Sequence, residues 1–254
     1  MIDERPFSLE GRRAVVTGGA RGLGLGMAKA LAAAGAAVAV VARTATTVEQ
    51  AIAEIGPKAV GIPFDVAGAA PMAELVDAAE AQLDGSVDIV LHAAGIQHRE
   101  PAEMFNRDAW QRVLDVNLTA PFFLSQEIGR RQLEAGRAGS HIFVGSLTSH
   151  ISVRDVVGYT ASKSGIYGVL RNLSLEWSGR GIRANGIGPG YIQTEMTKAL
   201  FDDTNRAQKI LDRIPMGRYG TPEDMGGLAV FLASDASAYI TGQLIMVDGG
   251  WSAS

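Results

Sequence analysis

The sequence predicts a doubly wound α/β fold, in which a parallel seven-stranded sheet lies between two layers of helices. Three observations favour this fold: short runs of β-branched residues recur along the chain, most are followed by a segment with helical periodicity, and the runs are almost wholly apolar. Continuous apolar strands are typical of parallel sheets that are buried on both faces. Alternating strands and helices imply right-handed crossovers, which place the helices over the sheet.

The predicted elements follow one another along the whole chain. We expect strands at residues 14–17, 38–41, 60–64, 87–91, 142–144, 183–187 and 244–247. We expect helices at residues 23–34, 48–55, 72–83, 108–133 and 159–177. No linker, charge block or repeat interrupts the series, so residues 1–254 are expected to form one Rossmann-type domain.

The segment 191–220 departs from this alternation. Its many polar residues favour weak helices rather than a sheet strand. A long insertion beside the carboxyl ends of parallel strands is often a lid over a substrate site. We therefore expect a substrate-binding lid here, with an excursion that has no functional role as the alternative.

The composition excludes several classes of protein. The 254 residues contain no cysteine, which excludes disulfide bonds, thiolate metal sites and cysteine nucleophiles. A net charge of −4 gives no electrostatic reason to expect nucleic acid or an anionic membrane as a partner. The start of the chain lacks the pattern of a secretory signal, and no apolar run approaches the ~18 residues of a membrane span. We expect a cytoplasmic protein.

A glycine-rich turn follows the first predicted strand and reads Thr17-Gly-Gly-Ala-Arg-Gly-Leu-Gly24. Glycine permits positive φ and lets the backbone approach a pyrophosphate, while the next helix directs its positive N-terminus at that anion. The strict G-x-G-x-x-G pattern fails because Met27 stands where the last glycine would be. The turn therefore indicates a dinucleotide site, and a tight turn without a ligand is the alternative.

Tyr159 and Lys163 lie four residues apart at the start of a predicted helix, so they share one face. At ~4 Å and an effective dielectric near 20, the ammonium would stabilise a phenolate by ~4 kcal/mol before desolvation. We therefore expect the pKa of Tyr159 to fall toward neutrality, where general acid–base catalysis works best. Ser146 follows a predicted strand and is placed to bind a substrate oxygen, with Ser149 as its competitor. A solvated helix face is the alternative for the Tyr–Lys pair.

Together these residues resemble those of the short-chain dehydrogenase/reductase family, and the resemblance covers nearly the whole chain. The motifs that carry it are the turn Thr17 to Gly24, Asp65-Val66, Ala94-Gly95, Asn117, Ser146, Tyr159-x-x-x-Lys163, Asn185-Gly-Ile-Gly-Pro-Gly190 with Thr194, and Val247-Asp-Gly-Gly250. The resemblance implies an NAD(P)-dependent oxidoreductase that interconverts a secondary alcohol and a ketone. In such an enzyme the cofactor carries the hydride and the protein aligns it and supplies the proton, without thiol or metal.

The resemblance also implies a role for each matching residue. Tyr159 would be the general acid/base, Ser146 would orient the carbonyl, and Asn117 would hold a water in the proton relay. Lys163 would bind the nicotinamide ribose and lower the pKa of Tyr159. The other cofactor contacts would be Gly18, Arg21, Gly22, Leu23, Gly24, Asp65, Val66, Ala94, Gly95, Pro189, Gly190, Ile192 and Thr194.

One motif departs from the family pattern. The family commonly has Asn-Asn-Ala-Gly after the fourth strand, whereas this chain has His92-Ala93-Ala94-Gly95. Ala93 removes a polar group that usually braces the central sheet, so we expect a structural compensation. We expect His92 to be buried and hydrogen-bonded rather than a proton carrier.

The end of the second strand bears on the choice of nicotinamide. NAD-preferring sites usually place an acid there, bonded to the ribose 2′-OH. This chain has Ala42 at that point and Arg43 next, and a guanidinium can pair bidentately with a 2′-phosphate. Arg21 is a second candidate. The sequence therefore predicts NADP over NAD, and surface cations without a cofactor role are the alternative.

Residues that flank the predicted site bear on the substrate. The candidates are His98, Arg99, His150 and Arg154, whose cationic and polar groups suit a hydroxylated anion such as a sugar acid. Solvated or interface residues are the alternative. Segments 97–105, 211–215 and 248–251 resemble the gluconate and deoxygluconate dehydrogenases of the family, and 3-oxoacyl carrier-protein reductases resemble the same core. A general ketone reductase and a cofactor-sensing protein without turnover stay open.

The sequence also bears on the binding partners and the oligomeric state that we expect. Members of the family are usually homotetramers, and the helices at 108–133 and 159–177 could bury apolar faces across such an interface. Trp251 could belong to a subunit contact or close a neighbour's site. Beyond a small-molecule substrate and further copies of the chain, the sequence indicates no partner.

Overall fold

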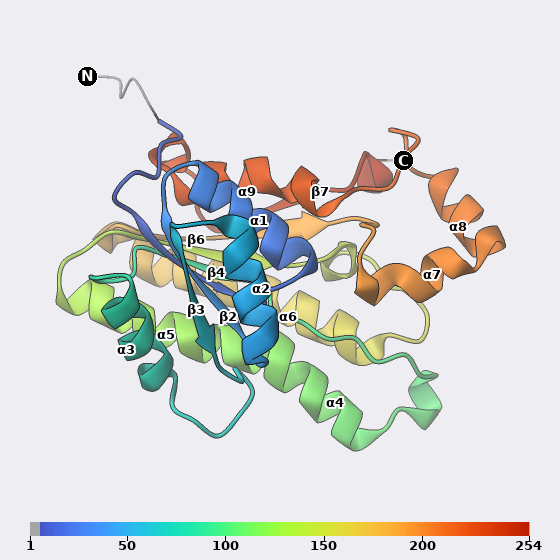
Figure 1. Cartoon of the computed structure of the whole chain (residues 1–254). Coiled ribbons are helices and arrows are strands. Elements are labelled where there is room, and N and C mark those ends of the chain that lie inside the picture. Colours follow the sequence, from blue (N-terminus) through green and yellow to red (C-terminus); the bar gives the residue numbers. More distant parts are fainter. Residues whose placement is uncertain (1–5, 254) are drawn as a thin grey trace.

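A computed structural model describes residues 6–253 and contains a parallel sheet between two layers of helices (Figure 1). The seven strands run in the order β3-β2-β1-β4-β5-β6-β7, so the predicted doubly wound fold is confirmed. The strands are β1 (Arg13–Thr17), β2 (Ala37–Ala42), β3 (Ala59–Pro63), β4 (Ile89–His92), β5 (Gly139–Val144), β6 (Ile182–Pro189) and β7 (Leu244–Val247).

Helices cover both faces of the sheet. One face carries α1 (Gly22–Ala33), α2 (Ala45–Ile55) and α9 (Gly226–Ala233), and the other carries α3 (Met72–Gln82), α4 (Arg107–Leu114), α5 (Ala120–Glu134) and α6 (Val157–Trp177). Beyond these layers, α7 (Lys198–Asp202) and α8 (Thr204–Leu211) project past the sheet on the side where the C-terminus lies (Figure 1). Among the helices within residues 6–253, none combines the length and apolarity that spanning a membrane would require.

The apolar strands fill two cores, one on each face of the sheet. Alternate strand residues point to opposite faces. Val16 and Val40 therefore pack beneath α1 and α9, while Val15 and Val41 pack beneath α3 and α5. Because both faces are covered, most buried strand positions are apolar, which explains the apolar runs in the sequence.

The segment predicted as one helix at 108–133 differs in the structure. α4 ends at Leu114, a π-helical turn spans Asp115–Thr119, and α5 begins at Ala120. The Ala120 amide donates to the Asp115 carbonyl, so one extra residue widens the turn. The extra residue shifts the helix register, and Asn117 becomes buried in place of an apolar residue. Turns of this kind are frequent at functional sites.

The segment 191–220 contains the weak helices that its composition predicts, α7 and α8. It leaves and rejoins the body at one place, where an isolated bridge joins Ile192 to Gly220. The Gln193 amide donates to the Gly220 carbonyl at 2.9 Å, and the Gly220 amide donates to the Tyr191 carbonyl at 3.0 Å. The ends of the excursion are therefore held together independently of its length.

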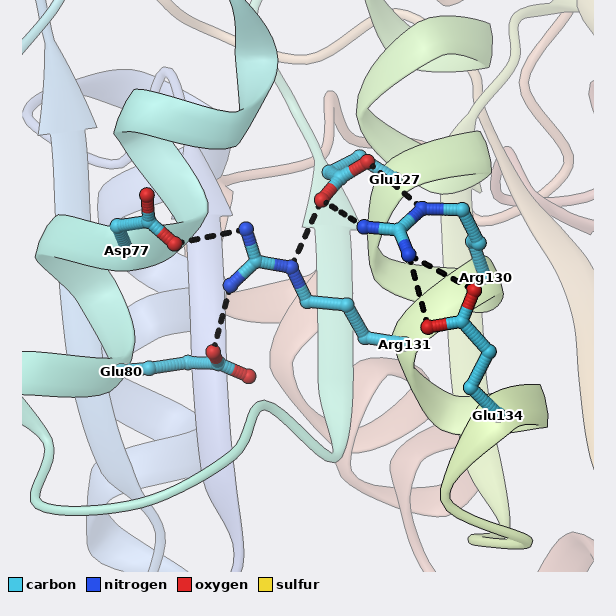
Figure 2. Close-up of polar contacts among 6 residues, drawn as sticks. All are labelled: Asp77, Glu80, Glu127, Arg130, Arg131 and Glu134. Carbon is cyan, nitrogen blue, oxygen red and sulfur yellow. Dashed lines mark hydrogen bonds and ion pairs between the residues drawn. The ribbon is translucent and has the colours of Figure 1, made fainter.

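Ion pairs join α3 to α5 on the outer surface (Figure 2). The Arg131 guanidinium on α5 contacts Asp77 at 2.7 Å and Glu80 at 2.8 Å, both on α3, and Glu127 at 2.8 Å on its own helix. Arg130 also binds Glu127, and its hydrogen bonds are the main reason that the pKa of Glu127 is lowered. Since Arg131 is 23% exposed, solvent screens this network only partly.

We expect Arg131→Ala to reduce the free energy of unfolding by about 1–2 kcal/mol, because it leaves three neighbouring carboxylates without their shared cation. Urea unfolding at low salt measures the change, which should shrink as salt is added. Arg130→Ala is the matched control, since Arg130 binds only its own helix and its loss should cost less. Equal losses in the two variants would contradict a bridging role for Arg131.

Candidate active site

The glycine turn after β1 packs directly on the loop after β4, where the strand order reverses. Gly18 has a φ of +66°, and a Cβ there would lie 2.6 Å from the Ala94 amide nitrogen. A Cβ at Gly24 would overlap the Gly18 carbonyl. Any side chain at these two positions would fill the turn, so glycine is required at both. Ligands of doubly wound sheets bind in the crevice at such a reversal.

The N-terminus of α1 faces this turn. The first turn of α1 lies within the described residues and carries no acidic side chain, and the N-cap residue Arg21 makes no side-chain cap. Free amides and the helix dipole together favour an anion. Leu23 is half-buried against the core under α1 and anchors this end. The glycine turn and the helix end therefore fit the pyrophosphate of a dinucleotide.

The segment after β6 lies opposite the glycine turn. A Cβ at Gly22 would lie 3.7 Å from Thr194, so these two segments face each other closely. The Gly190 amide donates to the Val247 carbonyl at 3.0 Å, which fixes the chain as it leaves β6 at Pro189. The exposed side chains of Arg21 and Glu195 form an ion pair of 2.9 Å across the same gap. The cofactor candidates from both segments thus line one crevice.

A second group of candidates lies at the ends of β2 and β3. β2 ends at Ala42, and Arg43 follows with its side chain exposed. The Phe64 amide donates to the Ala42 carbonyl at 2.8 Å, which brings Asp65 and Val66 beside this strand end. A cation and no carboxylate therefore stand directly after β2, as the sequence indicates.

The four catalytic candidates gather at the carboxyl ends of β4 and β5 and the start of α6. Tyr159 is hydrogen-bonded to Ser146. Lys163 is 4% exposed; its Nζ donates to the Val144 carbonyl at 2.7 Å and lies 5.6 Å from the centre of the Tyr159 ring. A Cβ at Gly95 would lie 3.5 Å from Asn117 Oδ1 and 3.9 Å from Lys163 Nζ. Gly95 therefore leaves space between them.

The pKa of Tyr159 differs from the expectation. Burial raises this pKa above its ordinary value, and the hydrogen bond with Ser146 partly opposes the rise. Burial also lowers the pKa of Lys163 to about 8, because the ammonium loses hydration. The expectation that the pKa of Tyr159 falls toward neutrality is wrong for this geometry, in which desolvation is the largest influence on the phenol.

Asn117 holds two parts of the site together through its buried amide. Its Oδ1 accepts from the Ile96 amide at 2.9 Å, and its Nδ2 donates to the Ile96 carbonyl at 2.9 Å. The same Nδ2 donates to Ser162 Oγ at 3.1 Å, and that hydroxyl donates to the Tyr159 carbonyl at 2.7 Å. Asn117 thus fixes the loop after β4 against the helix that carries Tyr159. Its contact with Ser162 was not foreseen from the sequence.

Ser149 proves to be a partner of Ser146 rather than its competitor. The Ser146 amide donates to Ser149 Oγ at 3.3 Å, and Ser149 Oγ donates to the Lys163 carbonyl at 2.9 Å. Ser146 Oγ accepts from the Thr148 amide at 3.1 Å. Ser149 therefore ties the Ser146 turn to α6, and it is Ser146 that reaches Tyr159.

Comparison with known proteins agrees with this geometry. Residues 18–252 match the family model described as enoyl-(acyl carrier protein) reductase. The chain is 44% identical over 247 residues to the 2-dehydro-3-deoxy-D-gluconate 5-dehydrogenase of Bacillus subtilis, which covers 96% of each chain. It is 38% identical over 247 residues to the gluconate 5-dehydrogenase of Gluconobacter oxydans, again over 96% of each.

A solved structure gives the same result. The gluconate 5-dehydrogenase of Burkholderia cenocepacia, in complex with NADP and tartrate, matches with a TM-score of 0.92 and 36% identity over 98% of each chain. The chain belongs to the short-chain dehydrogenase/reductase family. As a short-chain dehydrogenase/reductase, it is an NAD(P)-dependent oxidoreductase that acts on CH–OH groups. The resemblance carried by the sequence motifs is confirmed.

A buried network compensates for the departure from the short-chain dehydrogenase/reductase pattern at His92. His92 Nε2 lies 2.7 Å from Ser125 Oγ, which lies 3.1 Å from His141 Nδ1. His141 Nε2 lies 3.0 Å from Gln132 Oε1, and Gln132 Nε2 donates to the Val87 carbonyl at 3.0 Å. The expectation that His92 is buried and hydrogen-bonded is confirmed.

The carbonyl at Val87 sets the direction of every hydrogen bond in this network. A carbonyl only accepts, so Gln132 turns its Nε2 to Val87 and its Oε1 to His141. His141 then donates from Nε2 and accepts at Nδ1 from Ser125, which leaves His92 as the donor to Ser125. Burial lowers the pKa of His141 to about 3 and that of His92 well below its ordinary value, so both rings are neutral.

The substrate candidates lie at the rim of the crevice. His98 Nε2 lies 3.1 Å from Glu100 Oε2, and its ring packs edge-on against Phe105 at 5.2 Å. Glu100 also accepts from the Asn106 amide at 2.7 Å, and its own amide donates to the Asp155 carbonyl at 2.9 Å. Glu100 thus joins the loop after β4 to the loop before Tyr159, a link that sequence reasoning missed.

The other three substrate candidates are exposed. His150 packs edge-on against Tyr167 at 5.2 Å, and Arg99 and Arg154 have exposed side chains. Among the described residues, no side-chain hydrogen bond or ion pair joins His150 or Arg154 to Ser146 or Tyr159. The structure therefore places these candidates around the catalytic residues and not among them.

We expect the free energy of unfolding to fall as the pH is lowered from about 7 to about 5. Both buried histidines have pKa values below the ordinary one, so the unfolded chain takes up protons that the fold does not. One such histidine lowers stability by about 2 kcal/mol over this interval. His141→Gln removes one of them, so its stability should fall by about 2 kcal/mol less than that of the parent.

Urea unfolding of both proteins at the two pH values measures this difference. Parallel losses in the parent and in His141→Gln would contradict a neutral, buried His141. The direction of the change follows from the lowered pKa. Below the pKa of histidine in the unfolded chain, the unfolded state binds a proton that the fold does not, so the free energy of unfolding falls.

Proposed function

We propose that this enzyme is an NADP-dependent dehydrogenase of a sugar acid of the gluconate or deoxygluconate type, with Tyr159 as general acid/base. The observation that carries the proposal is the Ser146–Tyr159 hydrogen bond beside the buried Lys163, at the crevice that fits a dinucleotide. The names of its relatives, at 38–44% identity over nearly the full chain, support this substrate class.

The geometry suggests a role for each catalytic side chain. Ser146 Oγ already accepts from Thr148, so its hydroxyl hydrogen can be donated to a substrate oxygen. Tyr159 Oη, hydrogen-bonded to Ser146, reaches the same oxygen and gives it a proton during reduction. When bound, the reduced nicotinamide supplies the hydride. Lys163 stabilises the phenolate that Tyr159 leaves, and Asn117 holds the surrounding backbone in place.

The raised pKa of Tyr159 affects which direction of the reaction, reduction or oxidation, is favoured at a given pH. At neutral pH the phenol is protonated, which is the form that donates a proton in reduction. Oxidation requires the phenolate, so more alkaline pH favours it. Lys163, with a pKa of about 8, loses its charge over the same range, and this limits how far alkaline pH can help.

Two observations support NADP as the preferred cofactor. Arg43 is exposed directly after β2, where NAD-preferring sites usually carry an acid, and Arg21 lies in the glycine turn. The Burkholderia cenocepacia relative was solved with NADP. The same structure contains tartrate, a hydroxylated dicarboxylate, which supports an anionic substrate for this chain too.

We also propose that the segment 191–220 acts as the lid over the substrate, since it begins at the edge of the crevice, where its Thr194 faces Gly22. A homotetramer is proposed from the apolar side chains that α5 and α6 leave exposed, Phe123 and Leu175. The acyl carrier-protein reductase named by the family model is the alternative substrate class. Activity on an acyl thioester in place of a sugar acid would favour that alternative.

We expect the protein to oxidise gluconate or a deoxygluconate, and to reduce the matching keto acid, faster than it reduces acyl thioesters or simple ketones. Tyr159→Phe should lower kcat by about 10²–10⁴-fold, because it removes the proton donor and keeps the ring. Nicotinamide absorbance follows both reactions. Full turnover by Tyr159→Phe would refute the assigned role and reopen a cofactor-sensing protein.

We expect kcat/KM to be higher with NADP than with NAD. Arg43→Ala should lower kcat/KM for NADP by about 10–100-fold and leave that for NAD unchanged, since only NADP carries the 2′-phosphate. Arg180→Ala is the control, because Arg180 is another exposed arginine whose side chain contacts the Glu176 carbonyl. A clear preference of the parent for NAD would overturn the proposal.

A further inference from the structure

Trp251 near the C-terminus is buried against three separate segments of its own chain. It is 5% exposed and forms an apolar cluster with Leu147, Ile210 and Ile214. Leu147 directly follows Ser146, Ile210 lies on α8, and Ile214 follows that helix. One apolar cluster therefore joins the indole to both the turn that presents Ser146 and the base of the lid.

Two further contacts fix the orientation of the indole. The Tyr191 ring meets it at 4.8 Å with an interplanar angle of 66°, and Tyr191 directly follows Gly190 beside the crevice. The Arg213 guanidinium carbon lies 4.0 Å from the centre of the indole. Edge-on aromatic pairs and cations over an indole face are both attractive. Tyr191, Trp251 and Arg213 thus form a stack between the crevice and the lid.

The turn that carries Trp251 is itself rigidly held. The Asp248 carboxylate accepts from the Gly250 amide at 3.0 Å and from the Ser252 amide at 2.9 Å. The Met216 amide donates to the Gly249 carbonyl at 3.1 Å, and a Cβ at Gly249 would lie 2.8 Å from Ile214. The Asp248 bonds lie within the turn and hold it without the lid, whereas the Met216 bond attaches the lid to the turn.

The lid depends on this cluster because the cluster takes up the buried apolar side chain of α8. The ends of the lid meet at the bridge between Ile192 and Gly220, and among the α8 side chains that the structure describes, most are exposed and Ile210 is the buried one. The Tyr219 hydroxyl donates to the Ala207 carbonyl at 2.5 Å, a contact within the lid itself. The position of α8 therefore depends on how Ile210 and Ile214 pack in the cluster that contains Trp251.

We propose that Trp251 is a positioning residue that seats the base of the lid on the Ser146 turn, and so sets the affinity for the sugar-acid substrate without affecting that for the cofactor. The proposal rests on the proposed function for the identity of the substrate. It gives Trp251 a role at the active site of its own subunit, a role that the sequence did not indicate.

The test compares Trp251→Ala and Trp251→Phe with Trp177→Phe. Trp177 is the matched control, since it is a buried indole that packs on Gly129 and His141, away from the lid. We expect Trp251→Ala to raise KM for the sugar acid about tenfold or more, with a smaller fall in kcat and an unchanged dissociation constant for NADP. Trp251→Phe should lie between this variant and the parent, and Trp177→Phe should match the parent.

Limited trypsin digestion gives a second readout that needs no substrate. Cleavage after Lys198 and Lys209 in the lid should be about tenfold faster in Trp251→Ala than in the parent, because an unseated helix opens more often. Mass spectrometry locates the cuts. Unchanged lid cleavage with unchanged KM would overturn the proposal, and so would an equal loss of NADP binding and substrate binding.

The readouts separate this proposal from the proposed function. If no sugar acid is turned over by the parent, the proposed function fails, while the trypsin comparison still decides whether Trp251 seats the lid. If Trp251→Ala does not fold, Trp251→Phe and Arg213→Gln take its place in the same digestion. The proposal is then overturned if the lid is cleaved at the same rate in these two variants as in Trp177→Phe.

Discussion

The site depends on the reversal of strand order between β1 and β4, where the backbone of the glycine turn touches the backbone of the next loop. Gly18 lies so close to Ala94 that no side chain fits between them. Because every strand is parallel, the loops after β1, β4, β5 and β6 all emerge at this edge. The contact at Gly18 therefore sets the distance between the glycine turn and the loop whose Gly95 faces Asn117 and Lys163.

Around this crevice, buried polar side chains hold backbone in place. Asn117 satisfies the amide and carbonyl of Ile96, and Ser149 links the Ser146 turn to the carbonyl of Lys163. The network that begins at His92 does the same beneath the sheet, where it ends on the Val87 carbonyl. Each group is expensive to bury alone, so these networks permit one arrangement of the loops.

Much of the fold and of the site could be predicted from local sequence signals. Apolar runs gave the seven strands, and the glycine turn and the Tyr159–Lys163 spacing depend on residues close together in the chain. The π turn at Asn117 was missed because the apolar periodicity of α4 and α5 continues on either side of it. The pKa of Tyr159 was misjudged because burial depends on contacts between distant segments.

Contacts between loops could not be predicted from the sequence either. Glu100 meets Asp155, and Arg21 meets Glu195, across separations that no spacing rule relates. The place of Trp251 could not be foreseen for the same reason, since its partners come from four different segments. The sequence therefore indicated the catalytic candidates more readily than the residues that position them.

The bridge between Ile192 and Gly220 has a consequence for how this enzyme could diverge. The chain between those residues starts and ends at one point, so its replacement by a loop of another length would cost little closure entropy. The sheet and the cofactor crevice would not have to move. A grafted loop would need to supply only a pair of apolar side chains where Ile210 and Ile214 meet the indole. Given the lid role that we propose for this segment, its replacement would change substrate preference and leave the cofactor crevice in place.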